Sequence, residues 1–105
     1  MNILVKIKRL VIARKVFFTA KAREERYSSG LTVEEILESI INAPTINKTI
    51  NSKSQYRRGS REKLYVIISS TYDGKIIYTK GTIRKIGDHE EFYICLLYTS
   101  PSPRD

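Results

Sequence analysis

Cysteine, histidine and tryptophan are nearly absent from this chain of 105 residues, which has one cysteine (Cys95), one histidine (His89) and no tryptophan. A lone cysteine excludes an internal disulfide framework. One cysteine and one histidine are too few for the usual zinc sites, and no glycine-rich phosphate loop of known spacing occurs, so we expect neither a metal nor a cofactor. No Ser-His-Asp set can be built beyond His89, which we expect in a solvated turn.

Long apolar runs are also missing. Lys6, Lys8 and Arg9 interrupt the apolar start "MNILVKIKRLVIARKVFF", and no small-residue cleavage site follows it. We therefore expect neither a signal peptide nor a membrane span. Together with the scarcity of cysteine, this favours a cytoplasmic protein. A basic helix lying on a membrane surface is the alternative for residues 2–14.

Acidic residues are outnumbered by basic ones, 11 against 19, which gives a net charge of +8. The chain is 41% hydrophobic, which suits one domain with a modest core. A small domain this basic favours a polyanionic partner, most often nucleic acid. A surplus of charge that serves only solubility is the alternative.

The first third of the chain predicts two helices around a short strand. Apolar residues recur at helical spacing over residues 2–14, with Lys and Arg on the other side, which predicts an amphipathic helix. "VFFT" then predicts a very short strand at 16–19. Thr19 can cap a second helix, "AKAREERY", which we expect to end near Gly30.

The clearest local signal is a helix start in "LTVEEILESII". Thr32 and Glu35 have the spacing of a capping box, in which each residue bonds the other's backbone. An apolar stripe follows, and Pro44 prevents the helix from continuing. The pattern predicts a helix over residues 33–42.

The second half of the chain predicts strands. "TINKTI", "LYVIISSTY", "KIIYTKGTIRK" and "EEFYI" are rich in β-branched and aromatic residues, and the basic stretch "NSKSQYRRGSREK" between the first two predicts a mobile loop. Asp73 and Gly74 predict a tight hairpin turn of the primed type. Helices followed by strands imply an α+β fold, with N-terminal helices packed on one face of an antiparallel β-meander.

Strand alternation predicts which side chains share a sheet face. In "KIIYTKGTIRK" the alternation places four side chains on the face that we expect to be open: Tyr78, Lys80, Thr82 and Arg84. Lys75, Ile77, Thr79 and Ile83 take the other face, which suits a core. In the preceding strand, Leu64, Val66 and Ile68 suit the core, which leaves Tyr65 on the open side.

A cationic surface with interleaved tyrosines suits RNA, because Lys and Arg neutralise phosphates and aromatic rings stack on unpaired bases. The candidates for nucleic-acid binding are Arg57, Arg58, Lys63, Tyr65 and Arg84. Arg61, Lys80 and Tyr78 are candidates for RNA cleavage, in which cations stabilise charge on the phosphate and a tyrosine or lysine moves a proton. A sheet face that is merely solvated is the alternative.

The end of the chain, "CLLYTSPSPRD", differs from everything before it. Pro101 and Pro103 cannot donate to a strand ladder, so "TSPSPRD" is not expected to form a strand, whereas "CLLY" could continue one. Residues 95–105 resemble the conceptual translation of a widely used transposase sequencing adapter. The resemblance implies that the native sequence is visible as a single domain over residues 1–94, truncated at its C-terminal end. A genuine Pro-Ser linker is the alternative.

Residues 3–94 resemble an uncharacterised bacterial domain family allied to RelE-, HigB- and BrnT-like toxins. The stretches that carry the resemblance are "VFFTAKAREERYSSGLTVEEILESIINAP", the basic loop, and "LYVIISSTYDGKIIYTKGTI". The resemblance implies a RelE-like or barnase-like toxin architecture, metal-independent cleavage of messenger RNA and a cognate antitoxin protein as partner. Many relatives carry His-Ala where this chain has Lys21-Ala22, so Lys21 joins the catalytic candidates.

The leading hypothesis is therefore an RNA-binding, toxin-like protein that acts as an endoribonuclease. A non-catalytic nucleic-acid-binding module is the second hypothesis. A structural interaction domain, whose sheet edge pairs with an antitoxin strand or a second copy, is the third. RNA cleavage separates the first two hypotheses, and salt-sensitive RNA binding separates both from the third.

Overall fold

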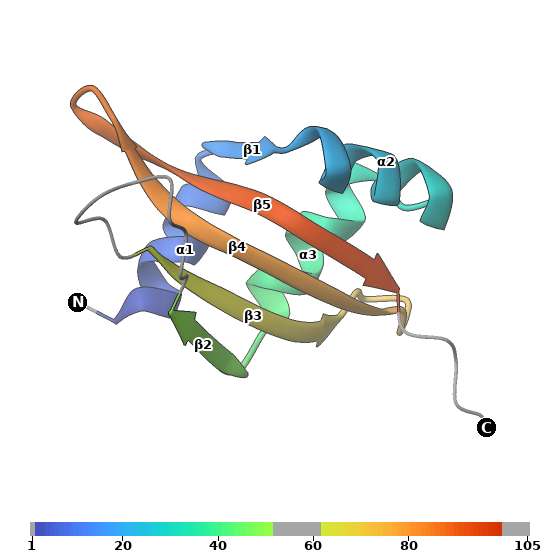
Figure 1. The fold of residues 1–105 in the computed structure, drawn as a ribbon. Helices are drawn as coiled ribbons and strands as arrows, with labels where there is room; N and C mark the ends of the chain where they lie inside the picture. The colour runs from blue at the N-terminus through green and yellow to red at the C-terminus, as the bar shows by residue number, and fades with distance from the viewer. Residues whose placement is uncertain (1, 52–61, 100–105) are drawn as a thin grey trace.

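The computed structural model describes residues 2–51 and 62–99, which form three helices and five strands (Figure 1). Three helices and a mixed sheet confirm the α+β class. In chain order the elements are α1 (Ile3–Ile12), β1 (Val16–Phe18), α2 (Ala20–Ser29), α3 (Val33–Asn42), β2 (Lys48–Asn51), β3 (Lys63–Ser70), β4 (Ile76–Ile86) and β5 (His89–Thr99).

The strands form one sheet in the order β1-β5-β4-β3-β2. β2 to β5 are antiparallel neighbours, as the sequence predicts, but β1 pairs parallel with β5. The sheet is therefore mixed, and the expectation of a purely antiparallel meander is wrong at this one edge. The parallel pairing is possible because α2, α3 and three strands separate β1 from β5 along the chain, as a parallel crossover requires.

Helix ends follow the local sequence. The expected capping box is confirmed in α3: the Thr32 side chain accepts from the Glu35 amide at 3.1 Å, and the Glu35 carboxylate accepts from the Thr32 amide at 2.9 Å. α2 ends at Gly30, whose φ of 70° is left-handed. α1 ends in the same way, but with Arg14 at a φ of 61°, a conformation that costs a non-glycine residue about 1–2 kcal/mol.

All three helices contribute to one core on one face of the sheet, and Figure 1 shows α1 and α3 behind the strands. Phe92 and Ile94 of β5 and Ile77 of β4 are completely buried there. They pack with Ile7, Val11, Ala22, Leu31, Ile36, Leu37 and Ile40 from the helical half of the chain. Because the helices cover this face only, the opposite face of the sheet carries no described helix.

Strand β3 faces the other way from the sequence-based prediction. Tyr65 and Ile67 pack on the core side, whereas Ile68 is 42% exposed. The prediction that Tyr65 lies on the open side is therefore wrong. The reason is that "LYVIISS" is apolar at both alternating sets of positions, so pairing with β4, which sets Ile67 opposite Thr79, decides the face.

The hairpin between β3 and β4 also differs from the prediction. Among residues 71–75 only Gly74 has a positive φ, at 90°, whereas a type I′ turn requires two such residues. The amide of Gly74 donates to the carbonyl of Thr71 at 3.0 Å, and the amide of Thr71 donates to the carbonyl of Lys75 at 2.9 Å. The loop thus has three residues, with glycine at the left-handed position.

Strand β5 runs through residues 95–99, where the sequence changes character. The register shifts between Lys80 and Gly81, so that Gly81 pairs with Ile94 and Lys80 with Leu96. Cys95 is the extra residue of this bulge, and the shift turns Leu97 into the core, where it is completely buried. The expectation that "CLLY" continues a strand is confirmed. The expectation that "TSPSPRD" forms no strand is wrong at Thr99, which ends β5 opposite Ile77 because it precedes both prolines, and residues 100–105 lie outside the described residues.

One ion pair joins the helical layer to the β3–β4 hairpin and makes stability depend on pH. The Lys75 ammonium lies 2.5 Å from the Glu35 carboxylate, and this hydrogen bond, with that from Thr32, holds the pKa of Glu35 below its usual value of 4.5. A lowered folded-state pKa contributes stability above the unfolded value, and this is lost as pH falls through the folded value.

We therefore expect wild type to lose more stability than Glu35→Gln when the pH falls from neutral to below about 4. Urea unfolding at the two pH values measures the difference, and Glu24→Gln on the exposed side of α2 is the matched control. If the stability of wild type and of Glu35→Gln depends on pH in the same way, this ion pair does not contribute to the pH dependence.

Candidate nucleic-acid interface

The sheet face away from the helices is called the open face here. Residues directly opposite each other on neighbouring strands project to the same side, so the register defines three rows across this face. The first row contains Phe17, Tyr93 and Thr82. The second contains Lys48, Val66, Lys80 and Leu96. The third contains Ile68, Tyr78 and Tyr98.

The first row is an aromatic pair with a guanidinium above it. The rings of Phe17 and Tyr93 lie 4.8 Å apart at an angle of 39°, and Phe17 is 43% exposed. The Arg84 guanidinium lies 4.8 Å from the centre of the Tyr93 ring. Stacking by the cation holds the Tyr93 ring in one orientation.

Arg84 is also held by a carboxylate. Its Nε and one terminal nitrogen donate to the Glu62 carboxylate at 2.8 and 3.3 Å, a two-point contact that fixes the guanidinium plane. The cation predicted to bind nucleic acid thus lies on the expected face, but its charge is already paired. Its contacts suit positioning of Tyr93 better than phosphate binding.

The third row is a second aromatic pair. The rings of Tyr78 and Tyr98 are stacked, with centres 4.5 Å apart and planes within 10° of parallel. Tyr98 is 44% exposed, and Ile68, which lies on the other side of Tyr78, is 42% exposed. An aromatic surface of this kind can accept a further flat ring.

The middle row sets two lysines on either side of an apolar residue. Val66 separates Lys48 on β2 from Lys80 on β4, so the two lysine Cα atoms lie two strand spacings apart, about 10 Å. Within residues 2–51 and 62–99, neither lysine forms an ion pair. Their charges are therefore not offset by a described carboxylate.

Cys95 lies beside this row without being reactive. Its thiol donates to the Lys80 carbonyl at 3.4 Å. Burial raises the pKa of the Cys95 thiol, and the nearby Lys80 and Arg84 charges only partly oppose that effect. The thiol thus stays protonated at neutral pH, where it is a poor nucleophile.

The structure separates the other residues that the sequence singled out. Lys63 begins β3 on the same side as Tyr65, the helix-covered side, and is exposed. Lys21 lies exposed in the first turn of α2, a helix that packs along β5 and not β4. Arg57, Arg58 and Arg61 lie outside the described residues.

Sequence reasoning missed Phe17, Tyr93 and Lys48, which the register brings to the open face. The alternation in "VFF", where only the middle side chain is exposed, is a signal for Phe17, but one that gains meaning only when the β1–β5 pairing is known.

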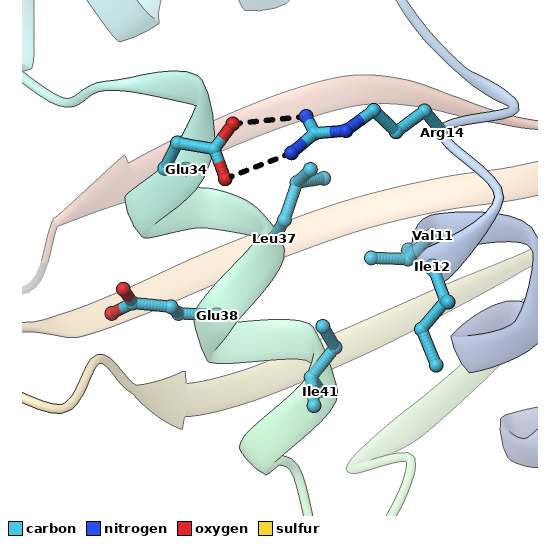
Figure 2. Close-up of a pocket in the computed structure, with 7 residues that line it drawn as sticks. All are labelled: Val11, Ile12, Arg14, Glu34, Leu37, Glu38 and Ile41. Carbon is cyan, nitrogen blue, oxygen red and sulfur yellow. Dashed lines mark hydrogen bonds and ion pairs between the residues drawn. The ribbon is translucent and has the colours of Figure 1, made fainter.

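A shallow pocket between α1 and α3 is the competing site (Figure 2). It has a volume of about 220 Å³ and is lined by Val11, Ile12, Arg14, Glu34, Leu37, Glu38 and Ile41. Figure 2 shows the guanidinium of Arg14 joined at two points to the carboxylate of Glu34, with an Arg14 Nη–Glu34 oxygen distance of 2.9 Å. The volume is below the 300 Å³ or more that small-molecule sites usually have. Arg14 and Glu34 already bond each other, and Glu38 accepts from the Tyr72 amide at 3.3 Å.

Two further findings concern the described residues only. They contain no group of three or more His, Cys, Asp or Glu side chains that could hold a metal ion. None of their helices is long and apolar enough to cross a membrane.

Comparisons with protein-family models, with curated proteins and with solved structures find no match to this chain.

Proposed function

We propose that this protein binds single-stranded RNA on the open face of its sheet. The observation that supports the proposal is the middle row, where Lys48 and Lys80 lie without an ion pair among the described residues and where Lys80 lies between the two aromatic pairs. Lysines neutralise phosphates, and exposed rings stack on bases that are not paired.

The sequence adds charge between β2 and β3. Residues 52–61 connect β2 to β3 and contain Lys53, Arg57, Arg58 and Arg61 with no acidic residue. Strands β2 and β3 carry Lys48 and Val66 of the middle row. Four cations in the connection between these strands favour a polyanion as the ligand.

A toxin-like endoribonuclease of RelE-like or barnase-like architecture is the finer form of the proposal. The observation that favours it is that Tyr78 and Lys80 project from β4 on one face, about 7 Å apart along the strand. A cation there could stabilise the charge that develops on phosphate as a ribose 2′-hydroxyl attacks, and the phenol could move a proton. A cognate antitoxin, proposed from the family resemblance, would then be its protein partner.

Replacing Lys80 is expected to weaken RNA binding and its salt dependence together. Each phosphate contact with a single strand contributes about 0.7 to the slope of log affinity against log salt, so Lys80→Ala should lower the slope by about that amount. Fluorescence anisotropy with a labelled single-stranded RNA between about 50 and 200 mM salt measures both quantities.

Lys75→Ala is the matched control, because it removes the same charge from the helix side of the molecule, where Lys75 pairs with Glu35. Equal losses in Lys80→Ala and Lys75→Ala would point to net charge alone and contradict a site on the open face. Cleavage of the same RNA, followed on a denaturing gel, tests the endoribonuclease form. RNA that is bound and remains intact identifies the non-catalytic form.

A further inference from the structure

The two aromatic pairs of the open face are too far apart for neighbouring bases of a stacked strand. Thr82 is opposite Tyr93 and Tyr78 is opposite Tyr98, so the two pairs are four residues apart along β4, roughly 13 Å. Bases stacked in a helix are about 3.4 Å apart along its axis. A stacked strand that covers one pair would thus need about four base steps to reach the other.

Between the aromatic pairs the open face offers little for reading base edges. Val66 and Leu96 are apolar, and the hydroxyl of Thr82 is occupied because it donates to the Lys63 carbonyl at 2.7 Å. The remaining polar group in this stretch of β4 is the Lys80 ammonium. A lysine is a point charge that suits a phosphate and does not discriminate between bases.

We propose that the open face selects an unstacked single strand, with one base on the Phe17–Tyr93 pair, a second base on Tyr78 and an intervening phosphate at Lys80. This inference rests on the proposed function and adds the form of RNA that is bound. Base stacking on protein rings tolerates any base, so preference follows the cost of unstacking the strand. Weakly stacking, uridine-rich RNA is therefore bound more tightly than adenine-rich RNA, and duplex RNA is bound weakly.

The second base is placed on Tyr78 and not on Tyr98, because Tyr98 lies in the segment that resembles a translated adapter. The Tyr78 ring belongs to β4, whose other residues fix its place through pairing with both β3 and β5. Variants for the test are therefore Phe17→Ala and Tyr78→Ala in the full chain. Tyr27→Ala is the control, because Tyr27 is 71% exposed on α2, away from the open face.

The experiment measures binding of oligouridine in which one base at a time is replaced by an abasic site. With wild type, two separate positions are expected to lose about five- to a hundredfold in affinity, the range that one stacked base contributes. Phe17→Ala removes the sensitivity at one position and Tyr78→Ala at the other, whereas Tyr27→Ala changes neither. Tyr78→Leu, which keeps the bulk of the side chain, gives the same result as Tyr78→Ala if stacking is what is lost, and circular dichroism verifies that each variant is folded.

Three results overturn the inference. Equal affinity for oligouridine and duplex RNA, or equal losses at every abasic position, contradicts the two-position geometry while leaving RNA binding intact. No binding to any RNA at low salt overturns the proposed function together with the inference. If no RNA binds, the chain is tested for self-association instead. Self-association of wild type that is lost in Phe17→Ala would show that the open face contacts protein.

Discussion

A chain that ends at Ile94 is expected not to fold, whereas a chain that ends at Thr99 keeps the whole of β5 and is expected to fold. Ending at Ile94 removes Leu97, which is completely buried in the core. It also removes the strand that pairs with residues 77–80 of β4 and leaves that half of β4 paired on one side only.

The loss of the buried Leu97 side chain already lowers the free energy of unfolding substantially. Loss of one buried leucine side chain costs about 2–5 kcal/mol, and a domain of this size has about 5–15 kcal/mol in total. Loss of the backbone pairing adds to that cost. The amide of Leu97 also donates to the Glu25 carboxylate of α2 at 3.0 Å. This contact joins α2 to the part of β5 that follows the residues paired with β1.

Far-ultraviolet circular dichroism and urea unfolding of the two truncated chains measure the difference. Cooperative unfolding of the chain that ends at Ile94, with a midpoint near that of the longer chain, would contradict the role of residues 95–99. The result also bears on the adapter resemblance. If residues 95–105 derive from an adapter, the native continuation has to supply a strand with a buried apolar side chain at the place of Leu97.

Gly81→Ala is expected to be the most damaging single-methyl change in the sheet. A Cβ at Gly81 would collide with the backbone carbonyl oxygen of Tyr93 and would lie 2.9 Å from the Cζ atom of the buried Phe92 ring. Overpacking of a core costs about 1–3 kcal/mol when side chains can adjust, and here one of the opposing atoms belongs to the backbone.

Urea unfolding of Gly81→Ala measures the loss, and Phe92→Leu provides the control. Phe92→Leu removes the ring from the path of the new Cβ but leaves the Tyr93 carbonyl in place. The double variant should therefore remain less stable than Phe92→Leu alone. An unfolding midpoint of Gly81→Ala equal to that of wild type would show that the register at the bulge can shift without cost.

Helix positions were predictable because their signals are local. The Thr32–Glu35 capping box and Pro44 delimit α3, and the structure places that helix at Val33–Asn42, the predicted span. The faces of β4 were predictable for a similar reason, since its two sides differ in polarity. β3 is apolar on both sides, so only its pairing with β4 could reveal that Tyr65 faces the core.

The candidate site was predictable only where it lies on one strand. Alternation within β4 brings Tyr78 and Lys80 together without any knowledge of the fold. Phe17, Tyr93 and Lys48 come from three other strands, and their place beside β4 depends on register. A three-residue strand such as β1 carries too few residues for a sequence pattern to show that it pairs parallel with β5.

The central claim is that RNA binds the open face, and amide chemical shifts of the labelled full chain during titration with oligouridine at low salt test it most directly. We expect the largest shifts around Phe17, Lys80 and Tyr93, while amides near Ile12 and Ile41, in the pocket between α1 and α3, stay unchanged. Shifts concentrated around that pocket, or no shifts at all, would contradict it.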